Sequence, residues 1–308
     1  MYKVVIVTGP TATGKTKLAL ELAKKYNGVL INCDSRQIYK GLDIITGKDI
    51  NNKIIKLYDI VDPKKNFSSF DFQKLAQPLI EEIIKQGKVP IVVGGTYFYI
   101  YHLLYQIETE NIVADWKLRT ELGKKTVLEL QEILKKLAPN LKLNQSDFNN
   151  PQRLVRKIEI SQYQKFLRLL RLRSGQVRSG QANIKDQNDK AKIKELPFKL
   201  KEFYRKVDLE FIGLKYGNKD DLIGAIRERT KKRLEQGAID EVKNLLKQGY
   251  LETDPGMKTI GYQQIIRFLK GKITKEQAIE QWINKEIQYA KRQMTFMKKD
   301  PNIKWIGI

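Results

Sequence analysis

The segment Gly9-Pro10-Thr11-Ala12-Thr13-Gly14-Lys15-Thr16 has the residue types and spacing of a phosphate-binding loop. It follows an apolar run at 4–8 and opens a segment of helical periodicity at 15–25, the context that such a loop requires. Backbone N–H groups at the helix start can hold phosphate oxygens, Lys15 adds a positive charge, and the Thr16 hydroxyl can ligate Mg²⁺. The loop therefore predicts binding of a phosphate or pyrophosphate group together with Mg²⁺.

An acidic residue follows the second apolar run of the chain. Asp34 comes directly after residues 28–33 and is followed by Ser35, Arg36 and Gln37. The carboxyl ends of parallel strands face the ligand crevice, so we expect Asp34 near the bound phosphates, as a metal ligand through water or as a general base. The alternative is that Asp34 caps a following helix. Ser35 and Gln37 could hydrogen-bond to the edge of a base.

A pair of glycines, Gly94 and Gly95, follows the apolar run at 89–93 and precedes Thr96. Glycines permit close approach of the backbone, and Thr96 could donate to a phosphate or a base. The alternative is a strand-to-helix turn capped by Thr96. No carboxylate ends this run, whereas enzymes that hydrolyse nucleoside triphosphates usually place one there. The aromatic residues at 97–105 are expected to pack a helix and not to stack on bases.

Basic residues recur at helical spacing in two later segments. Arg153 and Arg156, which follow Asn150-Pro151-Gln152, lie three residues apart and share one helix face, which could grip neighbouring phosphates or a base. A solvated charged face is the alternative for this pair. The segment 291–299 supplies another basic face.

Alternating apolar runs and helical segments in the first hundred residues predict an α/β fold, with a parallel sheet covered on both faces. After the strand at 4–8, we expect buried strands at 28–33, 57–61 and 89–93. A long helix is expected at 69–86, with Ser68 as its N-cap.

The residue pattern changes from about residue 111, where basic segments of helical periodicity follow one another without a strand signal. A polar, basic stretch at 171–192 has the composition of a loop, and the apolar run at 209–214 indicates a return to the sheet. Helices are expected at 126–137, 151–170, 221–248, 262–270 and 275–299. The resulting organisation is a P-loop NTPase-like core at 1–110, a helical insertion domain at 111–196, and completion of the core with C-terminal helices at 197–308.

The chain is strongly basic, with 58 Lys+Arg against 35 Asp+Glu and a net charge of +23. A lysine-rich proteome would account for part of this excess, but its size favours a polyanionic partner, most commonly a nucleic acid. Cys33 and His102 are the only residues of their types, which excludes an internal disulfide and a zinc site of the Cys/His type. No apolar run of membrane-spanning length and no signal peptide is recognisable, so we expect a cytoplasmic protein without a membrane segment.

Taken together, these motifs resemble the tRNA dimethylallyltransferases, also called tRNA isopentenylpyrophosphate (IPP) transferases, over nearly the whole chain. The resemblance rests on the phosphate loop, 34–44, Gly94-Gly95-Thr96 with Tyr99, Asn150-Pro151-Gln152-Arg153, Ile260-Gly261-Tyr262 and 291–296. It implies transfer of a dimethylallyl group from dimethylallyl diphosphate to N6 of adenosine 37, beside the anticodon of tRNAs that read codons beginning with U.

The resemblance also implies roles for individual residues. Asp34 matches the general base, and Thr96 matches a contact to the flipped adenosine or the phosphates. Lys15, Arg119, the loop amides and Mg²⁺ on Thr16 would stabilise the departing diphosphate. The tRNA-contacting positions would be Asp34, Ser35, Arg36, Gln37, Thr96, Arg119, Gln152, Arg153, Leu154, Val155, Arg156, Lys258, Tyr262, Gln263, Lys291, Arg292, Gln293 and Lys298.

The chain departs from the family pattern in three places. The stretch at 170–192 is longer and more basic than expected, and Lys258 and Gln263 stand where arginines are often found, which weakens bidentate recognition there. The Cys/His finger of eukaryotic members is absent. We expect a monomer that binds the tRNA anticodon stem-loop. The alternatives are a relative that prenylates free AMP or ATP, a small-molecule P-loop kinase, and a non-catalytic RNA-binding module.

Overall fold

The computed structural model describes residues 1–49, 55–107, 109–110, 112–173 and 198–308. These residues form two compact units. The core unit comprises Met1–Gln106 and Phe198–Ile308, and the helical unit comprises Ile107–Pro197. The sequence placed the insertion at 111–196. The basic stretch at 171–192 lies, from residue 174 onward, outside the described residues.

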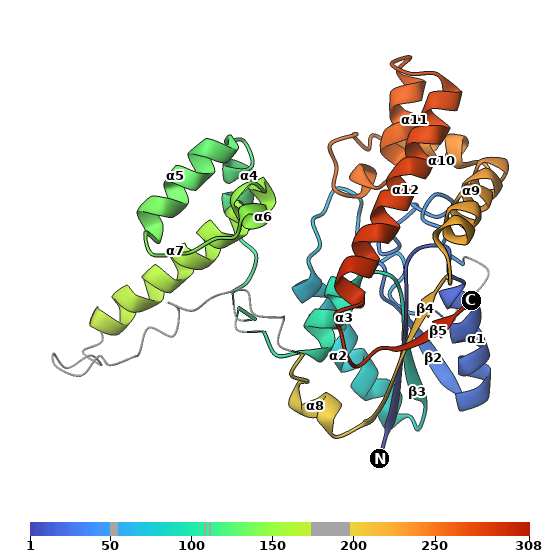
Figure 1. Ribbon diagram of the computed structural model, residues 1–308, viewed down its shortest axis with the longest axis horizontal. Helices are drawn as coiled ribbons and strands as arrows, with labels where there is room; N and C mark the ends of the chain where they lie inside the picture. The colour runs from blue at the N-terminus through green and yellow to red at the C-terminus, as the bar shows by residue number, and fades with distance from the viewer. Residues whose placement is uncertain (50–54, 108, 111, 174–197) are drawn as a thin grey trace. The chain divides into compact units, whose positions relative to one another are not determined.

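Five parallel strands form the sheet of the core unit, in the order β2-β3-β1-β4-β5 (Figure 1). They are β1 (Lys3–Thr8), β2 (Gly28–Asn32), β3 (Val89–Val93), β4 (Asp208–Lys215) and β5 (Lys304–Gly307). The central strand β1 pairs with β3 on one side, Val5 opposite Ile91, and with β4 on the other. The two halves of the core unit thus complete one sheet, and the expected α/β fold with a parallel sheet is confirmed.

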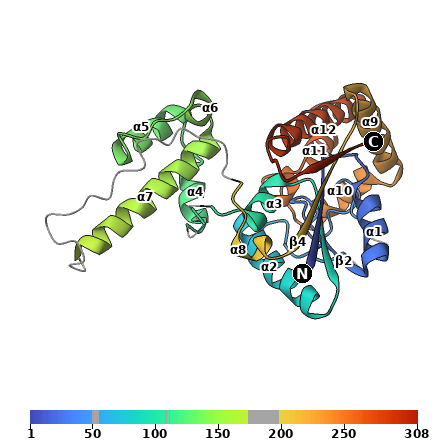
Figure 2. The same cartoon turned by 60° about the horizontal axis from the view of Figure 1, so that its bottom comes forward.

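Helices cover both faces of this sheet. The views in Figures 1 and 2 place α1 (Lys15–Tyr26) on one face and α2 (Ser69–Lys85) on the opposite face. On the first face, fully buried Val5, Leu30 and Ile91 form a core cluster with Ala19 of α1. The predicted cap of α2 is confirmed, because the Ser68 hydroxyl accepts from the backbone N–H of Asp71 in a capping box.

The remaining helices of the core unit gather beside α2 and beyond the carboxyl ends of the strands. They are α3 (Tyr97–Leu104), α8 (Glu202–Arg205), α9 (Lys219–Glu235), α10 (Ala238–Lys247), the 3₁₀ helix η2 (Gly256–Lys258), α11 (Tyr262–Leu269) and α12 (Lys275–Met297). The single helix expected at 221–248 is wrong. Gly237 adopts a left-handed conformation, with φ of 98°, and separates α9 from α10.

The strand expected at 57–61 is also wrong. Leu57 and Asp59 have φ angles of 65° and 56°, in the left-handed region that an extended strand excludes. Only isolated bridges remain around them, joining Ile31 to Lys56 and Tyr39 to Val61. An ion pair of 2.6 Å between the Asp59 carboxylate and buried Lys48 accompanies this conformation.

The helical unit consists of α4 (Trp116–Leu122), α5 (Val127–Leu137), α6 (Gln145–Phe148) and α7 (Pro151–Arg173). A capping box between Thr126 and Glu129 begins α5. The hydrophobic core of the helical unit contains Leu130 and Leu134 of α5, with Leu154 and Ile158 of α7. Across the described residues of both units, no helix is long and apolar enough to cross a membrane.

The tyrosines of α3 and Tyr105, which follows the helix, pack as predicted. Tyr97, Tyr99, Tyr101 and Tyr105 are buried, and the hydroxyls of Tyr97 and Tyr105 donate to the buried carboxylate of Asp300 at 2.9 and 2.7 Å. Phe98 also packs against a helix, since its ring centre lies 5.1 Å from that of Phe296 in α12, but it remains 47% exposed.

A glycine-to-alanine pair tests how closely β3 approaches the end of β2. A Cβ at Gly94 would lie 2.1 Å from the carbonyl oxygen of Cys33, a backbone atom that cannot move aside easily. We expect Gly94→Ala to lower the free energy of unfolding by about 3 kcal/mol, measured by urea denaturation. Gly224→Ala is the control, since nothing lies within 4 Å there, and alanine should stabilise α9 by about 1 kcal/mol. Equal effects at both positions would contradict the close contact.

Candidate active site

The phosphate loop joins the end of β1 to the start of α1 and is held in shape by its own contacts. Gly9 has a φ of 142°, and a Cβ there would lie 2.4 Å from the carbonyl oxygen of Leu214. Gly14 has a φ of 73°, a left-handed conformation that favours glycine. The Thr13 hydroxyl donates to the carbonyl of Pro10 at 2.9 Å. These contacts and conformations fix the path of the loop backbone.

Lys15 begins α1 and turns back over the loop, where its ammonium donates to the Pro10 carbonyl at 2.6 Å. Burial and, to a smaller extent, the nearby charge of Arg229 together lower the pKa of Lys15 to about 7, against an opposing effect of Asp34. A bound anion would stabilise the protonated form and raise this pKa. An anionic ligand would therefore keep the Lys15 ammonium protonated at neutral pH.

Two arginines of α9 line the pocket beside this loop, and the sequence patterns did not single them out. The Arg229 guanidinium donates to the Thr11 hydroxyl at 2.8 Å and to the carbonyl of Thr46 at 3.4 Å. Arg233, one turn later, is buried. Burial lowers the pKa of both arginines. Their i, i+4 spacing was a usable signal, but it is lost among the many charged residues of α9.

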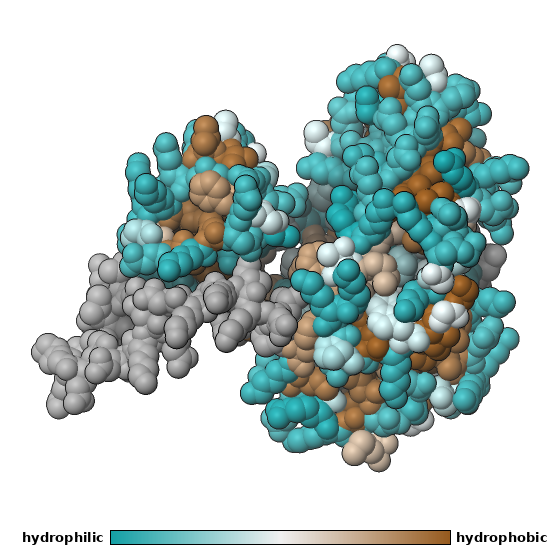
Figure 3. Space-filling model, viewed as in Figure 1, coloured by the Kyte–Doolittle hydropathy of each residue, from teal (hydrophilic) through white to brown (hydrophobic). Residues whose placement is uncertain are grey.

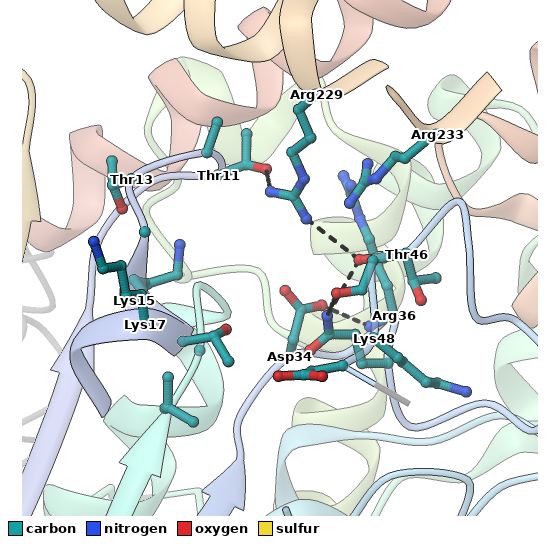
Figure 4. Close-up of a pocket in the computed structure, with 18 of the residues that line it drawn as sticks. Thr11, Thr13, Lys15, Lys17, Asp34, Arg36, Thr46, Lys48, Arg229 and Arg233 are labelled. Atoms are coloured by element: carbon teal, nitrogen blue, oxygen red, sulfur yellow. Dashed lines mark hydrogen bonds between the residues drawn. The ribbon is translucent and has the colours of Figure 1, made fainter. Parts of the chain in front are cut away.

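These groups line one pocket of about 1160 Å³ within the core unit (Figure 4). The close-up shows Lys15 and the loop threonines on one side of the pocket, Arg229 and Arg233 on another, and Asp34 across from the loop. The structure therefore brings together the phosphate loop and the acid that the sequence placed at the second strand end.

Asp34 lies in a tight turn at the end of β2. Its carboxylate accepts from the backbone N–H of Arg36 at 2.9 Å, and its own N–H donates to the Asn32 side chain at 3.1 Å. No helix begins here, since residues 35–38 form a turn. The interpretation of Asp34 as a helix cap is therefore wrong.

Thr96 occupies the N-cap position of α3 but makes no side-chain capping bond. Its hydroxyl accepts from the backbone N–H of Ser35 at 2.9 Å and donates to the Ser35 hydroxyl at 3.1 Å. A simple capping role is thus wrong for Thr96. Its side chain joins the Asp34 turn to the glycine pair that precedes α3.

Arg36 points away from solvent and is held by α12. Its guanidinium pairs with the Glu286 carboxylate at 2.8 Å and lies 3.9 Å from the centre of the Tyr289 ring. Glu286 is 2% exposed. Burial raises its pKa, but the charges of Arg36, Arg233 and Arg229 outweigh burial and keep the pKa below its usual value. The carboxylate of Glu286 thus partly balances three arginines.

Several residues expected to contact tRNA have internal roles in the core unit. Gln293 is buried, accepts from the backbone N–H of Thr11 at 3.0 Å and donates to the carbonyl of Gly95 at 2.7 Å, so it joins the two glycine loops. Tyr262 is fully buried, and its hydroxyl donates to Glu241. The amide of Gln37 donates to the carbonyls of Thr46 and Gly47, and that of Gln263 donates to those of Glu252 and Met257.

Other expected contact residues of the core unit lie at its surface. Lys258 is exposed at the end of η2. Lys291 and Arg292 are exposed on α12, and exposed Lys298 follows its last residue. These four cations are accessible to a large polyanion.

Among the expected contact residues of the helical unit, some have partners within the unit or are buried, and others are exposed. Arg119 binds both carboxylate oxygens of Glu159, at 3.0 and 2.7 Å, and Arg156 pairs with the same carboxylate. Arg153 is exposed and pairs with Asp147 at 2.7 Å, and Gln152 is exposed. The side chains of Leu154 and Val155 are buried in the core of this unit, so only their backbones remain for an RNA contact.

The residues present fit Mg²⁺ only in part. Thr16 lies in the first turn of α1 and lines the pocket, as a ligand to a metal on bound phosphates must. Within the described residues, no three His, Cys, Asp or Glu side chains gather to hold a metal by themselves. A metal here would depend on phosphate oxygens and water, the coordination that Mg²⁺ commonly keeps.

Comparison with known proteins identifies close relatives. Residues 37–300 match the family model described as IPP transferase. The chain is 34% identical to the tRNA dimethylallyltransferase of Acetivibrio thermocellus, over 100% of this chain and 92% of the relative. It is 35% identical to that of Staphylococcus haemolyticus, over 98% of this chain and 86% of the relative.

Solved structures agree with these sequence relatives. The full-length tRNA isopentenylpyrophosphate transferase from Bacillus halodurans matches with a TM-score of 0.66 at 32% identity, over 100% of this chain and 90% of the other. A eukaryotic dimethylallyltransferase acting on tRNA matches with a TM-score of 0.72 at 25% identity, over 100% and 74% of the two chains.

Replacing Lys15 tests the cost of burying its charge. Lysine is protonated in the unfolded chain up to a pKa near 10.5 but loses its proton near pH 7 in the folded pocket. The resulting destabilisation is fully present below about pH 7 and fades as the pH rises toward 10.5. We therefore expect Lys15→Met to melt at a higher temperature than the parent chain at pH 6.5, with the difference shrinking at pH 9.5.

The same variant should lose stabilisation by pyrophosphate. In thermal melts with Mg²⁺ and pyrophosphate, the parent chain should gain stability and Lys15→Met should gain little. The surface variant Lys243→Met, which removes an exposed lysine of α10, is the control. A Lys15→Met protein that is less stable without ligand would contradict the pKa shift.

Replacing Glu286 tests how much its carboxylate stabilises the folded chain by balancing the positive charge of Arg36, Arg229 and Arg233. Glu286→Gln leaves the half-buried guanidinium of Arg36 without its partner, so we expect the free energy of unfolding at pH 7 to fall by about 3 kcal/mol. Because the pKa of Glu286 is depressed in the folded state, its contribution is present above about pH 4.5 and is lost as the pH falls below it. Denaturant titrations at pH 7 and pH 4 check both points.

The control is Glu202→Gln, which breaks an exposed ion pair with Lys206 and should leave stability unchanged. Equal stability of Glu286→Gln and the parent chain at pH 7 would show that Glu286 does not compensate the arginines.

Proposed function

The chain belongs to the IPP transferase family, and on this premise we propose that it transfers the dimethylallyl group of dimethylallyl diphosphate to N6 of adenosine 37. The acceptors are tRNAs that read codons beginning with U, and the products are N6-(dimethylallyl)adenosine and diphosphate. The observation that carries the proposal is that the phosphate loop and Asp34 line one pocket, with Thr96 bonded to the residue that follows Asp34.

The cationic side of the pocket suits the diphosphate of the donor. The amides of the phosphate loop and the ammonium of Lys15 bind its oxygens, and Arg229 lies within hydrogen-bonding distance of the loop at Thr11. As the bond between C1 and the bridging oxygen breaks, negative charge grows on the leaving diphosphate, and these fixed cations stabilise it. Mg²⁺ held by the Thr16 hydroxyl, phosphate oxygens and water would neutralise part of that charge.

The acceptor side of the pocket suits an adenine. Its N6 amine is a poor nucleophile because the lone pair is delocalised into the ring. Asp34 accepts a hydrogen bond from N6 and takes its proton as the C1–N6 bond forms, so the proton ends on the carboxylate. The Thr96–Ser35 contacts keep the Asp34 turn in place during this step.

The charge of the chain suits a tRNA acceptor. Reaching N6 requires the adenosine to leave its stack, at a cost of a few kcal/mol that is smaller in an anticodon loop than in a duplex. Phosphate contacts to the exposed cations offset this cost, consistent with the net charge of +23. We further propose that the protein acts in the cytoplasm as a monomer.

The three alternatives predict different products. A relative acting on free AMP needs neither the helical unit nor this charge, and a kinase would turn over ATP without tRNA. Gly94-Gly95 follows the end of β3, with no carboxylate there to position a water, which disfavours hydrolysis of a nucleotide. A non-catalytic RNA-binding module would form no product.

The decisive experiment supplies labelled dimethylallyl diphosphate and Mg²⁺ with either AMP or unmodified tRNA, followed by nucleoside analysis. We expect label in N6-(dimethylallyl)adenosine from tRNA alone. Label on AMP alone would overturn the proposal, as would ATP turnover without a prenylated nucleoside.

Removing the carboxylate of Asp34 tests its role as base. We expect Asp34→Ala to lower the rate of single-turnover prenyl transfer roughly 10²-fold or more, with unchanged affinity for tRNA. Asp240→Ala, which removes an exposed acid of α10, is the matched control and should keep the parent rate. Equal rates for Asp34→Ala and the parent chain would refute the assignment.

A further inference from the structure

An aromatic pair lies at the surface where α3 meets the last turns of α12. The ring centres of Phe98 and Phe296 are 5.1 Å apart, with an angle of 60° between the ring planes. Phe98 is 47% exposed and Phe296 is half-buried, whereas the tyrosines of α3 are buried. The internal packing of α3 therefore does not account for Phe98.

This pair is fixed relative to the pocket by α12. Tyr289, Gln293 and Phe296 follow one another at spacings of four and three residues, so they share one face of the helix. Tyr289 and Gln293 line the pocket. Phe296 lies seven residues, or about 10 Å, along the helix from Tyr289. That is roughly the span of three stacked nucleotides at about 3.4 Å each.

The second ring is fixed to the acceptor side of the pocket. Phe98 lies in the first turn of α3, two residues after Thr96, whose hydroxyl bonds to Ser35. The two rings thus come from the two helices that hold the Asp34 turn. An RNA that places one base at Asp34 would carry a neighbouring nucleotide past this pair.

The surroundings of the pair are cationic. Residues 291–299 contain four exposed cations, Lys291, Arg292, Lys298 and Lys299, and no acid. The next residue, Asp300, is acidic but buried under the hydroxyls of Tyr97 and Tyr105. Figure 3 shows hydrophilic residues along the visible face of α12, interrupted by paler, more apolar atoms toward its carboxyl end. Aromatic rings among cations match a polyanion that has exposed bases.

We propose that Phe98 and Phe296 form a stacking platform for an unpaired base of the RNA, next in sequence to the reacting adenosine. The surrounding lysines and arginine bind the phosphates on either side of that base. Stacking tolerates any base, because each has a π-face, so the platform fixes the path of the strand and not its sequence. This inference rests on the proposed function.

The test separates recognition of RNA from recognition of the prenyl donor. Phe98→Leu and Phe296→Leu keep apolar bulk but remove the ring, and KM is measured for an unmodified tRNA transcript and for dimethylallyl diphosphate. We expect each variant to raise KM for the transcript about 10-fold and to leave KM for the donor unchanged. Phe98→Tyr, which keeps an aromatic ring at this position, should behave as the parent chain.

A fluorescent base reports stacking directly. Transcripts carrying 2-aminopurine on either side of the reacting adenosine should show quenching in one of the two positions when the parent protein binds. Phe98→Leu should lose that quenching, and Leu75→Ala, a change at a 44% exposed leucine of α2, should keep it.

Failure of this inference is distinguishable from failure of the proposed function. A parent protein that prenylates no tRNA would remove the proposed function itself. With an active parent, unchanged transcript KM in both leucine variants would overturn the platform, and so would equal increases for transcript and donor, which indicate a packing role. A parent dimer that Phe98→Leu converts to a monomer in sedimentation would assign the pair to contacts between copies of the chain.

Discussion

Positive charge held out of water around one pocket is the constraint on which much of the core unit depends. Lys15, Arg229 and Arg233 all have pKa values lowered by burial, while Arg36 is balanced by Glu286. Such an arrangement is costly in the free protein, because buried cations without partners are poorly solvated. The packing of the sheet and of α12 must outweigh that cost. A ligand with two phosphates would supply negative charge at this place. Its binding would then recover part of the free energy that burying the cations costs, and the cations would stabilise a diphosphate leaving group.

Short contacts of the backbone, with other backbone and with the Gln293 side chain, hold the charged groups in a defined arrangement. Gly94 lies against the carbonyl of Cys33, and Gln293 joins Gly95 to Thr11. These contacts hold the ends of β1, β2 and β3 at one edge of the sheet. The phosphate loop and the Asp34 turn consequently share a rigid support, as transfer between two bound groups requires.

A second set of contacts holds the segment that follows the Asp34 turn. The carboxylate of Glu241 accepts from the backbone N–H groups of Asp43, Ile44 and Ile45, at 2.8, 2.6 and 3.2 Å, and it also accepts from the Tyr262 hydroxyl. Arg229 reaches the carbonyl of Thr46 in the same segment. Residues of α9, α10 and α11 therefore shape the wall of the pocket, and a residue such as Tyr262 serves the site from the interior.

The sequence by itself determined the phosphate loop, the parallel α/β core and the position of Asp34 at a strand end. These features depend on local spacing, on glycine conformations and on apolar periodicity, which neighbouring residues carry. Only the tertiary structure decided the partners of Arg36, the roles of Arg229 and Gln293, and the exposure of Phe98. Each of these depends on contacts between segments 183 to 282 residues apart in the chain, such as Arg229 with Thr46 and Gln293 with Thr11. The expected strand at 57–61 was wrong for a different, local reason. Its apolar composition fits a strand, but Leu57 and Asp59 adopt left-handed conformations, with Asp59 paired to Lys48.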